Sequence, residues 1–184
     1  MLFALVMFFD KETEKIIYGY LEDLKRNNIS TYLMDMESRP HITIGIYNDI
    51  DPDDCVRKLE IFCANIREFD LTISSLGIFV RPKPCVFLAP VVNRMILDLH
   101  EELQNLYKSL DNEGYEFYMC NHWVPHCAID ISIDMDKIRR SADCLMKSFM
   151  PVSCKVVGMG WVEISKPVRY LNEYGLTKDY SLRR

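Results

Sequence analysis

Two periodicities of hydrophobic and polar residues, one typical of strands and one of helices, alternate along this chain. Apolar runs or a regular alternation of apolar and polar residues, both typical of β-strands, occur over residues 2–9, 41–47, 71–80, 86–89, 126–133, 152–164 and 168–176. Apolar residues three or four positions apart, typical of amphipathic helices, occur over residues 11–27, 56–66, 92–110 and 138–146. A further short strand is predicted over residues 31–36. The pattern predicts an α+β protein.

The order of these elements, strand-helix-strand-helix-strand, is found twice along the chain. Residues 150–165 in the second half have a pattern similar to that of residues 69–80 in the first. We therefore predict a single two-lobed domain over residues 1–184 with an internal duplication, in which each lobe is a sheet backed by helices.

Local signals mark where several elements begin or turn. Asp51-Pro52 places an acidic N-cap before a proline at the first helical position, and Asp134 is the expected N-cap of a later helix. The prolines of the Arg81–Pro84 segment suit a hairpin connection between two strands better than a strand interior.

The composition is that of a globular protein. Of the 184 residues, 49% are hydrophobic and 27% are charged, which excludes a disordered, collagen-like or coiled-coil chain. The formal net charge is −5, whereas a protein that grips long nucleic acid through many phosphates usually carries a basic surface. We expect no long nucleic acid as a partner, while a small phosphorylated ligand in a locally basic cleft is compatible with this charge.

The cysteines and the apolar N-terminal residues lead us to expect a cytoplasmic location. The seven cysteines are odd in number and include no C-x-x-C motif, so we expect reduced thiols in a cytoplasmic protein. Residues 1–9 are apolar but short and lack a basic flank, so we expect a buried strand and not a signal peptide. No run approaches the roughly 18 apolar residues of a membrane span, and we expect no membrane association.

The most specific pattern is a repeated histidine strand. Residues 40–45 (Pro-His-Ile-Thr-Ile-Gly) and 125–130 (Pro-His-Cys-Ala-Ile-Asp) each begin a strand after a proline. Side chains alternate faces along a strand, so one face is expected to be buried and the other to carry the histidine. The expected buried residues are Ile42, Ile44, Ile46, Cys127, Ile129 and Ile131, and the expected opposite face carries His41, Thr43, Gly45, His126, Ala128 and Asp130.

Two imidazoles at matching positions would converge if the two lobes pack around a pseudo-two-fold axis. Converging imidazoles supply both proton transfers of a metal-free phosphoryl transfer, because a pKa of about 6.5 lets the neutral and charged forms coexist near neutrality. Thr43 faces the same way as His41 and can donate a hydrogen bond to a phosphate oxygen.

The segments Pro40-His41-Ile42-Thr43-Ile44 and Trp123-Val124-Pro125-His126 resemble the two signature motifs of the 2H phosphoesterase superfamily, which includes 2′-5′ RNA ligase-like proteins and 2′,3′-cyclic phosphodiesterases. The resemblance covers nearly the whole chain. It implies a bilobal duplicated α+β fold, with two mainly antiparallel sheets, helices on their outer faces and a catalytic cleft between the lobes. It also implies that His41 and His126 are catalytic, that Thr43 binds phosphate, and that no metal or other cofactor takes part.

The second motif departs from the family pattern, which has Thr or Ser where this chain has Ala128. Losing one preorganised donor to a developing oxyanion costs roughly 10²–10³-fold in rate. Asp130, on the same expected face, would repel a phosphate. The candidates to replace the missing donor are Ser132, Tyr118, Arg81 and Lys83.

A zinc site is the alternative chemistry. Cys120, His122, His126 and Cys127 have metal-ligating side chains at close spacing. Pro125 disfavours the helix that would bring both histidines to one face, and the adjacent His126 and Cys127 point to opposite sides of a strand. His100 lies off the apolar stripe of its helix and is expected to be solvated.

We therefore expect a monomeric cytoplasmic phosphodiesterase that opens a small 2′,3′-cyclic nucleotide or acts on an RNA end by two-histidine acid/base catalysis. One alternative is a nucleotide- or phosphate-binding module of the same fold, with its chemistry impaired at Ala128. Another is a partner-binding protein without a phosphate site.

Overall fold

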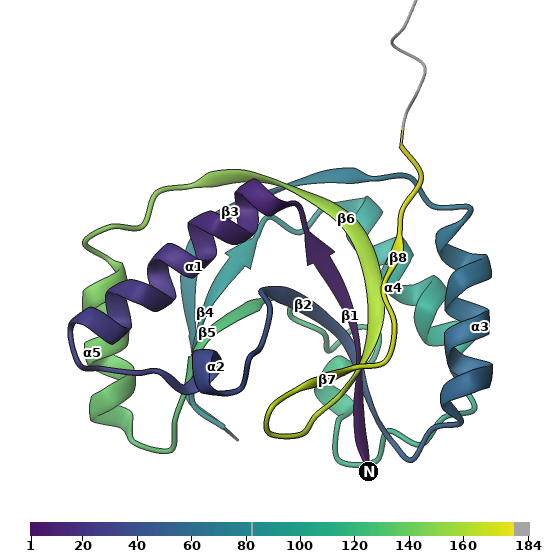
Figure 1. Cartoon of the computed structure of the whole chain (residues 1–184), viewed down its shortest axis with the longest axis horizontal. Coiled ribbons are helices and arrows are strands. Elements are labelled where there is room, and N and C mark those ends of the chain that lie inside the picture. Colours follow the sequence, from purple (N-terminus) through teal and green to yellow (C-terminus); the bar gives the residue numbers. More distant parts are fainter. Residues whose placement is uncertain (82, 179–184) are drawn as a thin grey trace, which may run out of the picture.

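The computed structural model describes residues 1–81 and 83–178, which alternate between strands and helices (Figure 1). The strands are β1 (Leu2–Phe9), β2 (His41–Asn48), β3 (Phe69–Phe79), β4 (Cys85–Pro90), β5 (Cys127–Ile131), β6 (Val152–Glu163), β7 (Arg169–Tyr170) and β8 (Tyr174–Gly175). The helices are α1 (Lys11–Arg26), α2 (Tyr32–Asp35), α3 (Pro52–Cys63), α4 (Arg94–Leu106) and α5 (Met135–Leu145), with a 3-10 turn, η1, at Glu116–Tyr118.

The strands form one sheet, in the order β2-β1-β6-β3-β4-β5, with β7 and β8 paired to β6. Neighbouring strands are antiparallel throughout. The predicted α+β class is confirmed, but the prediction of two separate sheets is wrong. The reason is the length of β6, whose residues 152–156 pair with β3 while residues 156–163 pair with β1. One strand therefore belongs to both halves of the sheet.

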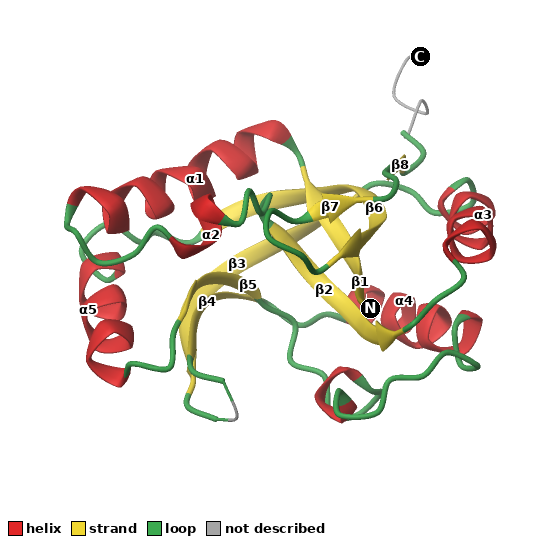
Figure 2. Ribbon diagram, turned by 60° about the horizontal axis from the view of Figure 1, so that its bottom comes forward, coloured by secondary structure: helices red, strands yellow, loops and turns green. Residues whose placement is uncertain are grey.

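The two halves of the chain have the same order of main strands and helices, apart from the short helix α2 and the turn η1. The order β1-α1-β2-α3-β3 is followed by β4-α4-β5-α5-β6, and the two histidine strands, β2 and β5, lie at the two ends of the strand order. Helices α1 and α5 lie together on one side of the molecule and α3 and α4 on the other (Figures 1 and 2). This arrangement is the one expected of a duplicated chain, and the duplication itself stays a prediction.

The predicted N-caps fix where helices begin. Asp51 accepts hydrogen bonds from the main-chain N–H groups of Asp53 and Asp54, with Pro52 at the start of α3 as predicted. Asp134 accepts from Asp136 and Lys137 at the start of α5. Each cap satisfies N–H groups that have no partner within the helix.

The alternation along β1 divides its side chains between two clusters. Phe3, Leu5, Met7 and Phe9 lie in the main core between the sheet and the helices. Ala4, Val6 and Phe8 lie on the other side of the strand, where they cluster with Val162. We call this other side of the sheet the second face. In the register of β1 with β2, Phe8 is opposite His41 and Val6 is opposite Thr43, which places both motif residues on the second face.

Each histidine strand contains a β-bulge at the third residue after its histidine. In β2 the register shifts so that Ile44 is the extra residue, and in β5 the extra residue is Ile129. A bulge places one more residue on one strand than on its partner and breaks the strict alternation of faces.

The bulges change the predicted faces of the residues that follow them. Gly45 was expected on the face of His41, but it is buried opposite Leu5 of the main core. Ile131 was expected in the core but is only half-buried, opposite Cys85. Ile46 was expected in the core, but it packs with the cluster of the second face, while Tyr47 enters the main core. Asp130 was expected beside the ligand, but it is fully buried and accepts hydrogen bonds from Ser30 Oγ at 2.6 Å and Ser141 Oγ at 2.7 Å. This carboxylate therefore lies away from the proposed phosphate position.

Two shorter segments also differ from prediction. Residues 31–36 were expected to be a strand, but they form the single helical turn α2, closed by hydrogen bonds from the N–H groups of Asp35 and Met36 to the carbonyls of Thr31 and Tyr32. Residues 168–176 pair with β6 only at β7 and β8. Between them the side chain of Asn172 accepts a hydrogen bond from the main chain of Trp161, which interrupts the strand.

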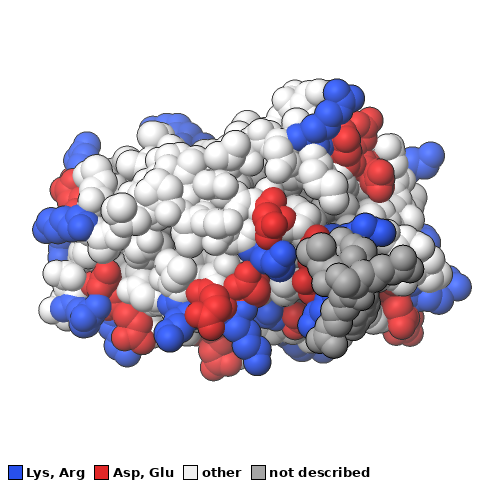
Figure 3. Space-filling view, turned by 90° about the horizontal axis from the view of Figure 1, so that it is seen from above, with Lys and Arg blue, Asp and Glu red and all other residues white. Residues whose placement is uncertain are grey.

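Charges of both signs are mixed on one face of the molecule (Figure 3). On the face seen in Figure 3, acidic and basic side chains lie next to one another and neither sign forms a continuous track. No helix in the described ranges is long and apolar enough to cross a membrane.

The bulge in β2 makes Gly45 a sensitive position. A Cβ at residue 45 would lie 2.6 Å from Tyr47 Oη and 2.7 Å from Tyr47 Cε2, and Tyr47 is fully buried. We expect Gly45→Ala to lower the free energy of unfolding by about 1–3 kcal/mol through overpacking. The control is Gly19→Ala on the exposed side of α1, where a Cβ meets nothing within 4 Å; there we expect a gain of about 0.5–1 kcal/mol. Urea denaturation measures both, and equal effects would contradict the packing argument.

Candidate active site

The two histidines are held by the same local contact. His41 is the first residue of β2, and His126 immediately precedes β5. The Nδ1 atom of His41 lies 2.6 Å from the carbonyl oxygen of Arg39, and Nδ1 of His126 lies 2.7 Å from that of Val124. A carbonyl can only accept, so Nδ1 carries the proton in both rings. When neutral, each imidazole therefore has an unprotonated Nε2 available to a ligand.

The structure brings the two histidine segments together, although they are 85 positions apart and lie on the strands that end the strand order. The thiol of Cys127 contacts the main chain of His41. His41 and Ala128 line the same small cavity of about 20 Å³. The imidazoles are close enough that a positive charge on His126 lowers the pKa of His41.

Trp123 joins the two motifs directly. Its Nε1–H donates a hydrogen bond of 3.0 Å to the carbonyl of Thr43, so a residue of the second motif binds the main chain of the first. The indole stacks on the imidazole of His100, with ring centroids 4.0 Å apart and an interplanar angle of 8°. The position of the Trp123–His126 segment therefore depends on helix α4, which carries His100.

His100 is a correction to the sequence prediction. It was expected to be solvated, but it is only 3% exposed. Its Nε2 lies 3.2 Å from the carbonyl of Ile44 and 2.9 Å from that of Tyr118, and Gln104 Nε2 donates to the same Ile44 carbonyl at 3.2 Å. These contacts give hydrogen-bond partners to the bulged residue of β2, and they are the physical reason why a histidine is buried there.

Aromatic rings surround His126. The centroids of Phe79 and Phe87 lie 4.9 and 5.3 Å from that of the imidazole, both in edge-on geometries, and Tyr118 lies 6.3 Å away. Phe87 has room because residue 77 is glycine, where a Cβ would lie 2.3 Å from the ring. The packing of these rings restricts the orientation of the His126 side chain.

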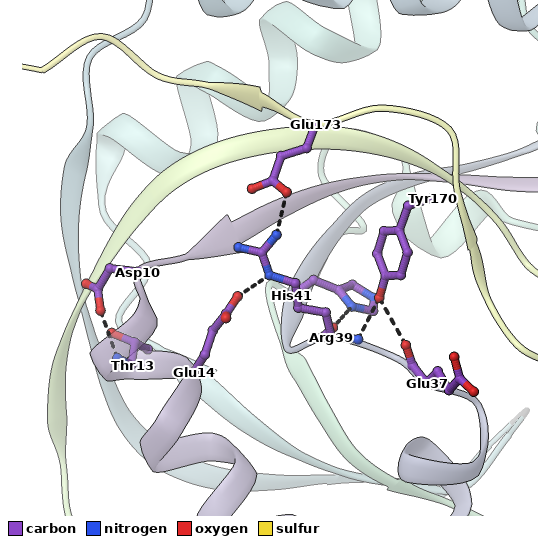
Figure 4. A network of polar contacts seen from close by, with 8 residues as sticks. All are labelled: Asp10, Thr13, Glu14, Glu37, Arg39, His41, Tyr170 and Glu173. Carbon is purple, nitrogen blue, oxygen red and sulfur yellow. Dashed lines mark hydrogen bonds and ion pairs between the residues drawn. The ribbon is translucent and has the colours of Figure 1, made fainter.

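His41 lies in a polar and charged environment instead. Arg39, two residues before it, forms ion pairs with Glu14 and Glu173 beside the histidine, and Tyr170 lies next to them (Figure 4). Sequence reasoning did not identify Arg39 or Tyr170 as part of the site. The position of Arg39 directly before Pro40-His41 was the available signal.

Burial changes the acid/base properties of both histidines. Loss of hydration lowers the pKa of His41 below its usual 6.5, against the opposing effect of the Arg39 carbonyl, and the positive charges of His126 and Arg39 lower it further. Loss of hydration also lowers the pKa of His126, against the effect of the Val124 carbonyl. At neutral pH the predominant state of both rings is therefore neutral.

The predicted phosphate-binding positions differ in what they offer. Thr43 lies half-buried on the second face with His41. Ala128 is opposite Phe87 in the register of β4 with β5 and offers no donor. The four proposed replacements are placed as follows: Ser132 Oγ accepts a hydrogen bond from the Asp134 main chain, Tyr118 packs near His126, and Arg81 and Lys83 are exposed between β3 and β4.

The four residues with zinc-ligand spacing, for which the sequence already disfavours a metal site, do not form one in the structure. Cys127 is 1% exposed and belongs to the main core, and burial raises its pKa to about 12. Cys120 Sγ lies 3.9 Å from His100 Nδ1. Over residues 1–81 and 83–178, no three or more His, Cys, Asp or Glu side chains are grouped so that they could hold a metal ion.

Comparison with known proteins gives one family. The model of the 2′-5′ RNA ligase superfamily matches residues 35–165, a range that includes both histidine motifs. No curated protein matches the chain in sequence.

Solved structures with the same fold cover almost the whole chain. The protein TT0787 of Thermus thermophilus has a TM-score of 0.60 and 13% identity, over 98% of this chain and 100% of its own. E. coli LigT in its apo form has a TM-score of 0.60 and 14% identity, over 96% of this chain and 97% of its own. At this identity the similarity shows the fold.

The lowered histidine pKa values predict a pH dependence of stability. Burial lowers the pKa of His41, His126 and His100 below 6.5, so the unfolded chain binds more protons than the folded chain as the pH falls through about 6.5. We expect the free energy of unfolding to decrease between about pH 7.5 and 5.5, and to do so less steeply in the double variant His41→Gln, His126→Gln. Urea denaturation at several pH values measures the slopes. The exposed His122→Gln is the control, and equal slopes in the two variants would contradict the prediction.

Proposed function

Because the chain belongs to the 2′-5′ RNA ligase superfamily, we propose that it is a phosphodiesterase that opens a 2′,3′-cyclic nucleotide or cleaves a phosphodiester at an RNA end. His41 and His126 are its acid and base, Thr43 donates a hydrogen bond to the phosphate, and the reaction uses no metal ion. A small phosphorylated nucleotide or RNA end is the ligand.

The shared contact of the two histidines carries this proposal. Both rings donate Nδ1–H to a carbonyl two residues earlier, so in both the Nε2 atom is left for chemistry. A catalytic imidazole needs its tautomer fixed in this way, because only one nitrogen can take or give the proton at the reacting atom. A purely structural histidine has no such requirement, and two with the same contact, each at the start of one of the two strands that end the sheet, favour the catalytic role.

In the proposed reaction, a water molecule attacks phosphorus and gives its proton to Nε2 of the neutral histidine. The bond between phosphorus and one ribose oxygen breaks, and the protonated histidine donates its proton to that oxygen. The product is a nucleoside 2′- or 3′-phosphate. Each proton transfer contributes about 10²–10⁴-fold to the rate.

We assign His41 as the base and His126 as the acid. The positive charge of Arg39 lowers the pKa of His41, whereas no Lys or Arg in the described ranges is among the groups that lower the pKa of His126; we therefore place the single proton of the active pair on His126. The position of His126 beside Phe79 and Phe87 restricts the orientation from which it donates.

A ligand of one similar structure supports the substrate class. E. coli LigT has been crystallised in complex with 3′-AMP, in a structure with a TM-score of 0.57 and 14% identity to this chain. A nucleoside 3′-phosphate is one of the two products of opening a 2′,3′-cyclic phosphate. We therefore propose that a nucleotide of this class binds near His41 and His126.

Single-histidine variants test both the reaction and the assignment. We expect His41→Ala and His126→Ala each to lower kcat/KM for a 2′,3′-cyclic nucleotide by about 10²–10⁴-fold. An aryl phosphodiester, whose leaving group needs no proton, separates the two roles: His126→Ala loses much less activity on it, whereas His41→Ala loses as much as before. Equal losses on both substrates would contradict the assignment.

The profile of kcat/KM against pH gives a second measurement on the same enzyme. It is expected to be bell-shaped, with its maximum below about pH 6.5 because burial lowers both histidine pKa values.

The need for a metal ion is tested separately. We expect EDTA to leave the rate unchanged, because the proposed reaction uses no metal ion. Undiminished activity in the double alanine variant, or a strict need for a divalent ion, would overturn the proposed function.

The missing donor at Ala128 favours a second candidate function, a nucleotide-binding module in which catalysis is impaired. Ala128 and His41 line the same small cavity of about 20 Å³, which is room for about one water-sized group. If the missing hydroxyl limits catalysis, Ala128→Thr raises kcat by about 10²–10³-fold. Ala128→Val has nearly the same shape without the hydroxyl and is the matched control. Equal rates for the two variants would show that a donor at residue 128 is not limiting.

A further inference from the structure

The C-terminal strap, residues 165–176, folds back along β6 and reaches the first histidine motif. Its main chain is fixed to the rest of the protein along its length: Val168 N–H donates to the carbonyl of Met36 at 2.8 Å, and Leu171 N–H to that of Trp161 at 2.9 Å. The strap lies so close to β6 that a Cβ at Gly160 would be 2.4 Å from the carbonyl oxygen of Asn172. Its position relative to the sheet is therefore well defined.

The strap holds the side chain of Arg39, two residues before His41. Arg39 Nη1 forms an ion pair of 2.6 Å with Glu173 of the strap, and Arg39 Nε pairs with Glu14 of α1 (Figure 4). The guanidinium lies over the ring of Phe8, 4.3 Å from its centroid. Although burial acts to lower it, the two carboxylates raise the pKa of Arg39. The two ion pairs and the Phe8 ring therefore hold the guanidinium in one position.

The strap also holds the main chain around Arg39. The hydroxyl of Tyr170 accepts a hydrogen bond of 2.6 Å from the N–H of Arg39 and donates one of 3.4 Å to the carbonyl of Glu37. Glu37 has a φ of 52°, in the left-handed region that is costly for a residue with a side chain. One hydroxyl thus bridges two main-chain groups on either side of Ser38 and holds a turn that the local sequence does not favour.

These contacts converge on the atom that orients His41. The carbonyl of Arg39 accepts the hydrogen bond from His41 Nδ1, and the strap fixes Arg39 through both its main chain and its side chain. We propose that Tyr170 and Glu173 are positioning residues that set the ring orientation and tautomer of His41 through Arg39. The catalytic consequence of this role rests on the proposed function, whereas the structural consequence does not.

His126 provides an internal comparison. Its Nδ1 makes the equivalent contact to the carbonyl of Val124, but Val124 is 48% exposed and its side chain is apolar. The second ring is packed by Phe79 and Phe87 instead. Loss of a contact from the strap should therefore change His41 and leave His126 as it is.

Nitrogen-15 NMR of the histidine side chains tests the proposal without any assay of activity. At a pH where both rings are neutral, the wild-type chain is expected to show a protonated Nδ1 and an unprotonated Nε2 at His41. We expect Tyr170→Phe and Glu173→Ala to give His41 a mixture of the two tautomers, while His126 keeps its wild-type signals. The control is Arg169→Ala, which removes an exposed ion pair of the strap with Glu163 and should leave both rings unchanged.

Kinetics on a 2′,3′-cyclic nucleotide then give the catalytic consequence. Tyr170→Phe is expected to lower kcat by about 2- to 10-fold, the value of one hydrogen bond, with little change in KM. Wild-type His41 signals in both Tyr170→Phe and Glu173→Ala would overturn the proposal, as would an equal change in Arg169→Ala. If the wild-type protein hydrolyses no cyclic phosphate, the proposed function fails while the tautomer measurement still decides the role of the strap. Should Tyr170→Phe unfold, Glu173→Ala, at a side chain 46% exposed, provides the same test.

Discussion

The site depends on how the carbonyl of Ile44 is satisfied. Ile44 is the extra residue of the bulge in β2, and a bulged residue loses its regular partner in the ladder. His100 and Gln104, one turn apart on α4, both bind this carbonyl, and the imidazole of His100 carries Trp123 stacked on its face. Trp123 in turn binds the carbonyl of Thr43. One carbonyl, bound by side chains of α4, thus couples the bulge, a helix and the second histidine motif close to His41 in the chain.

A bulge also lies three residues after His126, and in both strands the residue that follows the bulge turns into the protein interior. Different residues occupy that position in the two strands. Beyond each bulge, the fourth residue after the histidine turns away from the second face. In β2 that residue is Gly45, whose missing side chain leaves room for Tyr47. In β5 it is Asp130, whose carboxylate is satisfied by two serine hydroxyls. A buried carboxylate is tolerated only with such partners. The two motifs therefore share the position of the bulge, although the side chains around it differ.

The sequence was sufficient for those features that follow from local chemistry. The acidic caps at Asp51 and Asp134 and the exposure pattern up to the third residue of each motif needed only regular alternation and capping rules. The faces of Ile46 and Asp130 could not be predicted, because a bulge adds one residue to a strand without any local signal and reverses every later side chain. The burial of His100 could not be predicted either, since it follows from a carbonyl contributed by another strand. Arg39 and Tyr170 meet across 131 positions of the chain, which no local pattern encodes.

Ala128 differs in kind from Asp130, although neither matches its counterpart in the first motif. Asp130 is buried and has its own hydrogen-bond partners, so it contributes to the core and not to the surface offered to a ligand. Ala128 is the second residue after His126, and it lines a small cavity together with His41. Under the proposed function, what separates this chain from the family pattern of two His-x-Thr/Ser motifs is therefore the hydroxyl that residue 128 lacks. Because both imidazoles have the contact that fixes their tautomers and Thr43 is present, the proposed mechanism keeps its acid, its base and one of its two phosphate donors, and the effect that we expect of Ala128 is a slower reaction and not a different one.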